Sequence, residues 1–198
     1  MQNNHSDLLS GQKGPEMVAV IIVVVVALLG LLLVGAYNGI VRMRNQVDNG
    51  WSQIDVQIKR RADLIPNLVE TVKGYAAHES GTFEAVVAAR NATVAANSPA
   101  QAAAAEGPIA AALGKIFALA EAYPDLKADA NFRQLQSEIT ATEDRIAYAR
   151  QFYNDSVTRY HNKIDTFPGV VIVKVGNFPH RELFEADDTD RAVPKVEF

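Results

Sequence analysis

A histidine followed by a glutamate occurs once in the chain, at the start of the run from His78 to Thr82. Zinc proteases carry H-E-x-x-H on a helix, where both histidines bind the metal and the glutamate acts as general base. Thr82 stands where the second histidine is required. His161 and His180 have no neighbours at metal-ligand spacing either. We therefore interpret the His78 run as a surface turn and expect no metal site.

Four carboxylates follow one another along a single predicted helix: Glu138, Glu143, Asp144 and Asp155. A di-metal site in a helical bundle would require inward-facing Glu-x-x-His pairs on two helices, and the chain contains no Glu-x-x-His. It also lacks a glycine-rich phosphate loop and a G-x-S-x-G nucleophile elbow. We interpret the four carboxylates as a solvated face. No catalytic residue and no cofactor are predicted, and the chain is expected not to be an enzyme.

The composition of the 198 residues excludes several further classes. The absence of cysteine excludes disulfide scaffolds, thiolate metal sites and cysteine nucleophiles. A net charge of -4 and a pI near 5.6 argue against nucleic acid as a partner, because binding phosphates requires a basic face. A hydrophobic fraction of 48% excludes a wholly disordered chain.

Residues 17–37 form an apolar segment without a charged side chain. As a helix they span about 31 Å, which matches a hydrocarbon core of about 30 Å. A cleaved signal peptide is the alternative, but the run is longer than an h-region and no A-x-A-like site ends it. The segment is therefore predicted to be one transmembrane helix.

Basic residues predict the orientation of this helix. Arg42 and Arg44 follow it directly, whereas Lys13 is the only basic residue before it. The positive-inside rule then places residues 1–16 outside as a short tail and the rest of the chain in the cytoplasm. Tyr37 lies where an interfacial aromatic is expected, and Arg42 and Arg44 are expected at lipid headgroups.

Residues 38–168 show helical periodicity and predict a bundle. The first helix is expected to continue from the membrane and to end or kink at Pro66, because proline removes a donor and clashes with the preceding turn. A second helix is expected to reach about Ala96. The alanine-rich residues 100–107 are expected to form a loop or frayed turn before a third helix that ends at Pro124.

The longest periodic stripe predicts a fourth helix from Ala128 to Phe167. Its apolar positions alternate steps of three and four residues: Phe132, Leu135, Ile139, Thr142, Ile146, Ala149, Tyr153, Val157, Tyr160, Ile164 and Phe167. If Tyr153, Asn154 and Tyr160 point inward, they require hydrogen-bond partners.

Residues 169–198 change character, because the run Val170 to Val175 is β-branched and bounded by glycines. This pattern predicts a short extended or β segment. A lone strand has no partner in its own chain, so Val170, Ile172, Val173 and Val175 are candidates for pairing with another copy.

Gly35 and Gly39 form a G-x-x-x-G pair that could allow close packing of membrane helices. The fold class is thus all-α, with a transmembrane helix, a long antiparallel bundle and a C-terminal extended segment.

Several motifs of the bundle resemble the LemA family over about residues 37–168. They are the runs Trp51–Arg61, Asp63–Tyr75 and Ala120–Ala128, then Phe132, Leu135-Gln136, Thr142-Glu143, Arg145-Ile146, Ala149-Arg150 and Tyr153-Asn154. The resemblance implies one N-terminal anchor and a cytoplasmic antiparallel helical bundle. The chain departs from the family pattern at His161, where asparagine is expected, and in the run after Pro168.

These observations predict a single-pass protein of the bacterial cytoplasmic membrane, with its N-terminus outside. The expected function is a non-enzymatic scaffold or self-assembling interaction protein, with membrane lipid and further copies of the chain as partners. One alternative is an accessory or regulatory subunit of another membrane protein in envelope stress. Another is an unrecognised hydrolase.

Overall fold

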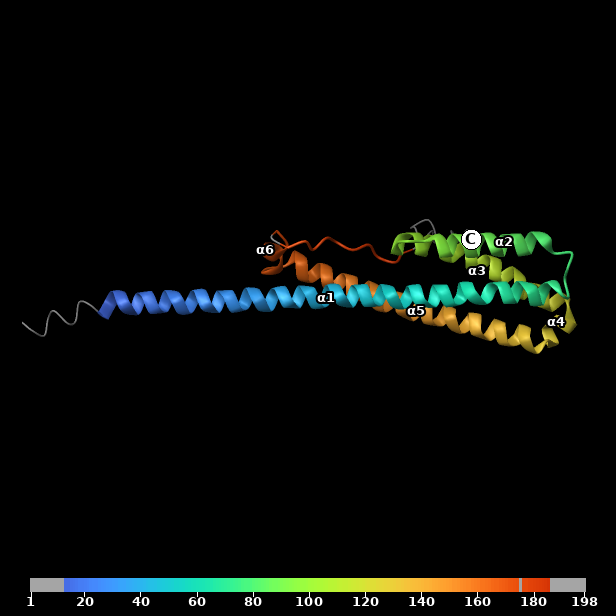
Figure 1. Ribbon diagram of the computed structural model, residues 1–198, viewed down its shortest axis with the longest axis horizontal. Coiled ribbons are helices and arrows are strands. Elements are labelled where there is room, and N and C mark those ends of the chain that lie inside the picture. Colours follow the sequence, from blue (N-terminus) through green and yellow to red (C-terminus); the bar gives the residue numbers. More distant parts are fainter. Residues whose placement is uncertain (1–12, 175, 186–198) are drawn as a thin grey trace, which may run out of the picture.

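One helix, α1 (Lys13–Lys73), runs the length of the molecule (Figure 1). The computed structural model describes residues 13–174 and 176–185, with side chains from Glu16 onward. The N-terminal part of α1 projects alone beyond the other helices, and its large apolar side chains between Met17 and Val34 are exposed. An exposed apolar stretch of this length indicates a membrane protein. The helix does not break where this stretch ends.

The predicted alternatives are that the first helix ends at Pro66 or kinks there. Pro66 lies inside α1, so the prediction that the helix ends there is wrong. Proline leaves the carbonyl four residues earlier without its usual backbone donor. That carbonyl belongs to Ala62, and it accepts a hydrogen bond of 3.2 Å from Arg90 Nε on the neighbouring helix. Because a side chain replaces the missing backbone donor, the helix continues for two more turns before the turn at residues 74–79.

Two helices lie along the distal half of α1 (Figure 1). The first, α2 (Ser80–Ala95), runs back along α1, and the second, α3 (Pro99–Ala122), runs again toward the distal end. Ser98 caps α3 by accepting from the Gln101 amide at 3.3 Å. The expected loop at residues 100–107 is wrong, because this stretch forms the first two turns of α3. Ala102 and Ala103 are buried against α1 residues of the core. Small side chains let two helices approach closely, and alanine has the highest helix propensity.

A short helix, α4 (Pro124–Ala128), leads into α5 (Ala130–Asp165), which runs antiparallel to α1 (Figure 1). The Asp129 carboxylate caps α5 by accepting from the Phe132 amide at 2.8 Å, and this bond lowers the pKa of Asp129. The predicted apolar stripe of this helix is confirmed for nine of its residues, which are buried, Ile146 and Tyr160 among them. Leu135 is half-buried, and Phe167 is exposed because it lies beyond the end of the helix at Asp165. The antiparallel all-helical bundle is confirmed for the described residues, which contain no strand.

The predicted C-terminal β segment is wrong, because residues 169–173 form a short helix, α6 (Gly169–Val173). Val175 lies outside the described residues. The amide of Val170 bonds to Thr166 O at 3.0 Å, so local bonds replace those of a sheet. The turn requires glycine, because a Cβ on Gly169 would collide with the carbonyl oxygen of Lys163. Without a strand, the expected edge pairing through Val170, Ile172 and Val173 has no basis.

After α6 the chain turns back and runs along the bundle without regular secondary structure (Figure 1). We call residues 177–185 the strap. Phe178 and Phe184 of the strap are buried in the core cluster formed by α1 and α5.

The core has two clusters along the bundle, one nearer the apolar end of α1 and one at the distal end. The first includes Ile54, Ile58, Ala103 and Ile146, and the second includes Ile65, Ile109 and Ile139. Three helices contribute to both clusters and carry a polar residue between the two contributions: Arg61 on α1, Glu106 on α3 and Thr142 on α5. A polar layer therefore separates two apolar layers.

Candidate functional site

The residues considered for metal or acid–base chemistry do not come together. His78 is exposed in the turn between α1 and α2, as predicted. Glu143, Asp144 and Asp155 are exposed on α5, and the half-buried Glu138 accepts a hydrogen bond of 3.0 Å from Gln134. Within residues 13–174 and 176–185, no group of three histidine, aspartate or glutamate side chains could hold a metal ion. The solvated face predicted for α5 therefore agrees with the burial of these residues.

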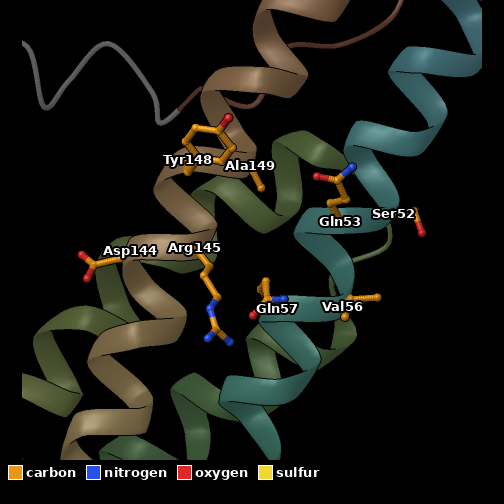
Figure 2. Close-up of a pocket in the computed structure, with 8 residues that line it drawn as sticks. All are labelled: Ser52, Gln53, Val56, Gln57, Asp144, Arg145, Tyr148 and Ala149. Carbon is orange, nitrogen blue, oxygen red and sulfur yellow. The ribbon is translucent and has the colours of Figure 1, made fainter.

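A groove lies between α1 and α5 on the bundle surface (Figure 2). It has a volume of about 460 Å³ and is lined by Ser52, Gln53, Val56, Gln57, Asp144, Arg145, Tyr148 and Ala149. We call it the α1–α5 groove. Figure 2 shows Arg145 pointing from α5 toward the Gln57 side of the groove. The buried Oε1 atom of Gln57 has no hydrogen-bond partner among the described residues.

Large apolar side chains stand exposed at this groove. Val56 is 55% exposed and Tyr148 is 74% exposed, and Phe152 lies one turn after Tyr148 on α5. A tyrosine over a groove with amide and charged neighbours is typical of protein interfaces. The periodicity argument missed these residues because they lie off the buried stripe. Their signal is the pair of aromatic residues four apart beside that stripe.

Arg61 and Glu106 form a bidentate ion pair between α1 and α3. Arg61 Nη1 lies 3.1 Å from Glu106 Oε2, and Nη2 contacts Oε1. Arg61 is 2% exposed and Glu106 is 21% exposed, so the guanidinium depends on this carboxylate for its charge balance. Arg61 Nε has no hydrogen-bond partner in the part of the chain that the structure describes. The ion pair fixes the position of α3 along α1. It does not form a reactive site, because the Arg61 side chain is buried.

The polar residues of α5 bind the strap. Asn154 makes two hydrogen bonds with Phe184, donating to its carbonyl at 3.1 Å and accepting from its amide at 2.9 Å. Tyr153 donates to Glu182 O at 2.7 Å, and Tyr160 donates to Pro179 O at 3.0 Å. Burial raises the pKa of Tyr153 to about 12 and also raises that of Tyr160, so both phenols keep the proton that they donate.

His161 completes this binding face. Its Nε2 accepts a hydrogen bond of 3.0 Å from the Arg181 amide, which requires a neutral ring with its proton on Nδ1. Burial, and then the neighbouring ring of His180, lower the pKa of His161, while Asp165 opposes the shift. Arg181 also reaches α1, where its guanidinium lies 2.9 Å from Asp48. The strap thus joins α5 to α1.

We expect strap docking to weaken as the pH falls below the ordinary histidine pKa of about 6.5. Because the pKa of His161 is lowered in the docked state, the undocked chain binds more protons below pH 6.5. Docking is therefore favoured as the pH rises toward 6.5. Above that pH, docking no longer depends on the protonation of His161. Amide hydrogen exchange of the strap, corrected for the intrinsic effect of pH, measures this dependence.

His161→Gln is the matched control, because the glutamine oxygen can accept from the Arg181 amide without titrating. The variant should show a smaller pH dependence than the natural chain. An equal dependence in both proteins would contradict the role given to His161.

Two of the predicted membrane-boundary residues, Tyr37 and Arg44, lie beside the strap. The ring of Phe178 packs edge-on against Tyr37 with centroids 5.6 Å apart, and the Arg44 guanidinium lies 5.7 Å from the Phe178 centroid. Arg42 is exposed. Of the two glycines, Gly35 has open space around it, whereas a Cβ on Gly39 would lie 3.3 Å from Lys163 Cε. Gly39 therefore faces α5 of its own chain.

Comparison with known proteins identifies relatives that match most of the chain. A family model described as the LemA family matches residues 50–198. Magnetosome protein MamQ 2 of Paramagnetospirillum magneticum is 27% identical over 215 residues, covering 93% of this chain and 79% of that protein. Magnetosome protein MamQ of Magnetospirillum gryphiswaldense is 26% identical with the same coverage. Protein LemA of Metamycoplasma hominis is 27% identical over 159 residues, covering 80% of this chain and 73% of that protein.

Proposed function

Because this chain belongs to the LemA family and carries an apolar helix continuous with its bundle, we propose that it is a membrane-anchored, non-catalytic scaffold that assembles with copies of itself. The observation that carries the proposal is the unbroken course of α1 from Lys13 to Lys73. No hinge separates the apolar segment from the bundle.

The continuity of α1 supports side-by-side assembly. Copies in one membrane share nearly the same orientation and depth, because each bundle is fixed to its own spanning segment. Association then costs less rotational freedom than it does between freely tumbling domains. The α1–α5 groove and its exposed apolar side chains would stand at the same height in every copy.

Lysine cross-linking in membranes tests self-assembly. We expect a ladder of products beyond the dimer, and Val56→Arg should weaken it by placing a charge at the groove. Val87→Arg is the matched control, because Val87 is 45% exposed on α2 and Val56 is 55% exposed on α1. Arginine adds no reactive amine.

Two outcomes would contradict the proposal. A chain that remains monomeric under mild cross-linking and joins a different protein would favour an accessory subunit. Equal ladders for Val56→Arg and Val87→Arg would remove the groove from the assembly contact.

We also propose that the protein lies in the bacterial cytoplasmic membrane with its N-terminus outside. The support is the basic residues Arg42 and Arg44 that follow the apolar segment. Since the chain has no cysteine, single cysteines report accessibility cleanly. Ser6→Cys should react with an impermeant thiol reagent in intact cells, whereas Val87→Cys, on α2 outside the α1–α5 groove and 45% exposed in the natural chain, should react only after lysis. The reverse pattern would overturn the orientation.

A further inference from the structure

The turn that joins α5 to the strap lies at the membrane-proximal end of the bundle. We call residues Phe167–Val173 the tip; it includes α6 (Figure 1). The tip packs beside α1, and together they line a groove of about 440 Å³ formed by Leu33, Val34, Tyr37, Val171, Ile172 and Gly176. The tip therefore contacts the apolar segment of α1 and not only the bundle.

The depth of this contact follows from the helix rise. Leu33 is one turn before Tyr37, so it lies about 6 Å further toward the bilayer centre. Leu33 and Val34 belong to the uncharged segment 17–37. Helices that lie in the membrane interface bury their apolar face by about 5–10 Å. The tip is therefore at the depth of the acyl-chain boundary.

The outer surface of the tip is apolar. Phe167 is 82% exposed, and Val170 and Val171 are also exposed, whereas Ile172 faces the core. Three exposed large apolar side chains within five consecutive residues, 167–171, are unfavourable in water. Contact with acyl chains would remove them from water without any further protein.

Exposed basic side chains lie near the tip in the sequence and on the part of α1 that follows the apolar segment. Lys163 and Lys174 flank it in the sequence and are exposed, and Arg42 is exposed on α1. Lys163 reaches α1 at Gly39, one turn before Arg42. Apolar residues followed by cations with long flexible stems match the order from acyl chains to anionic headgroups.

We propose that the tip inserts into the bilayer leaflet on the bundle side and gives the protein a second membrane contact beside α1. The groove between the tip and α1 is then occupied by a lipid acyl chain. Its lining is continuous with the apolar surface that the segment of α1 already presents to the membrane. This inference rests on anchorage by α1 and is independent of self-assembly. It explains why an apolar turn stands exposed at the end of α5 that lies nearest the membrane.

Spin labelling of the full-length protein tests the insertion. Phe167→Cys and Val171→Cys each receive a nitroxide in vesicles of phosphatidylethanolamine and phosphatidylglycerol. Both labels should relax more with oxygen, which concentrates in lipid, than with a water-soluble nickel complex. Val87→Cys is the matched control for Val171→Cys, because the two valines are 45% and 49% exposed and Val87 lies on α2. Its label should respond mainly to nickel.

Two results would overturn the proposal. Labels at 167 and 171 that respond to nickel as strongly as the label at 87 would place the tip in water. Labels shielded from both reagents would show that protein covers the tip. Unchanged hydrogen exchange of the strap in each labelled protein serves as the check that the tip is folded.

Discussion

Glu106→Ala is expected to lower the free energy of unfolding by about 3–5 kcal/mol. The substitution leaves the Arg61 guanidinium, which is 2% exposed, without its carboxylate inside the bundle. An unpaired buried charge costs far more than the pair contributes, because water cannot solvate it. Denaturant unfolding of the full-length protein in detergent, followed by circular dichroism, measures the loss.

Glu121→Ala provides the control on the same helix. Glu121 pairs with Lys127 at 2.7 Å, but both side chains are largely exposed, so the loss should stay below about 1 kcal/mol. Replacing both buried partners, as Arg61→Met with Glu106→Leu, should recover much of the stability lost in Glu106→Ala. Equal losses for Glu106→Ala and Glu121→Ala would show that the buried charge is not what destabilises the first variant.

Phe184→Ala should release the strap, with a loss of about 3–5 kcal/mol in the free energy of docking. The ring is 2% exposed in the core cluster of α1 and α5, and its backbone makes both hydrogen bonds to Asn154. The substitution leaves a cavity in place of the ring. It removes the apolar contact that keeps the Phe184 backbone in position for its two hydrogen bonds to Asn154. Hydrogen exchange of the strap amides should become much faster, while the amides of α5 change less.

Phe167→Ala is the matched phenylalanine change, because that ring is 82% exposed. In detergent it should alter strap exchange little, since surface substitutions stay within about 0.5 kcal/mol. If Phe167→Ala released the strap as far as Phe184→Ala does, docking would depend on the tip rather than on the buried anchor.

The elements with strong periodicity could be predicted from the sequence. The stripe of α5 and the uncharged segment of α1 follow directly from the spacing of apolar residues, and the family motifs agree with both. Local signals also placed the end of α3 at Pro124, because Tyr123 precedes a proline that starts the next helix. Such features depend on neighbours along the chain.

The errors arose where a distant residue decides the local structure. Pro66 stays helical because Arg90, on another helix, donates a hydrogen bond to the carbonyl of Ala62, which has no backbone donor. The run after Pro168 has β propensity, but residues 13–174 and 176–185 offer it no strand to pair with, and local bonds shape it into α6. The strap partners of Tyr153, Asn154 and Tyr160 lie up to 30 residues away. No pattern in the sequence identifies those partners.

The unbroken course of α1 also makes the molecule a lever. From Tyr37, the expected membrane boundary, to Lys73 the helix extends about 54 Å. Spanning helices change their tilt when the bilayer becomes thicker or thinner, and a change of roughly 10° moves the far end of such an arm by roughly 9 Å. Differences in membrane thickness would thus be converted into lateral displacement at α2 and α4, at the end of the bundle furthest from the lipid.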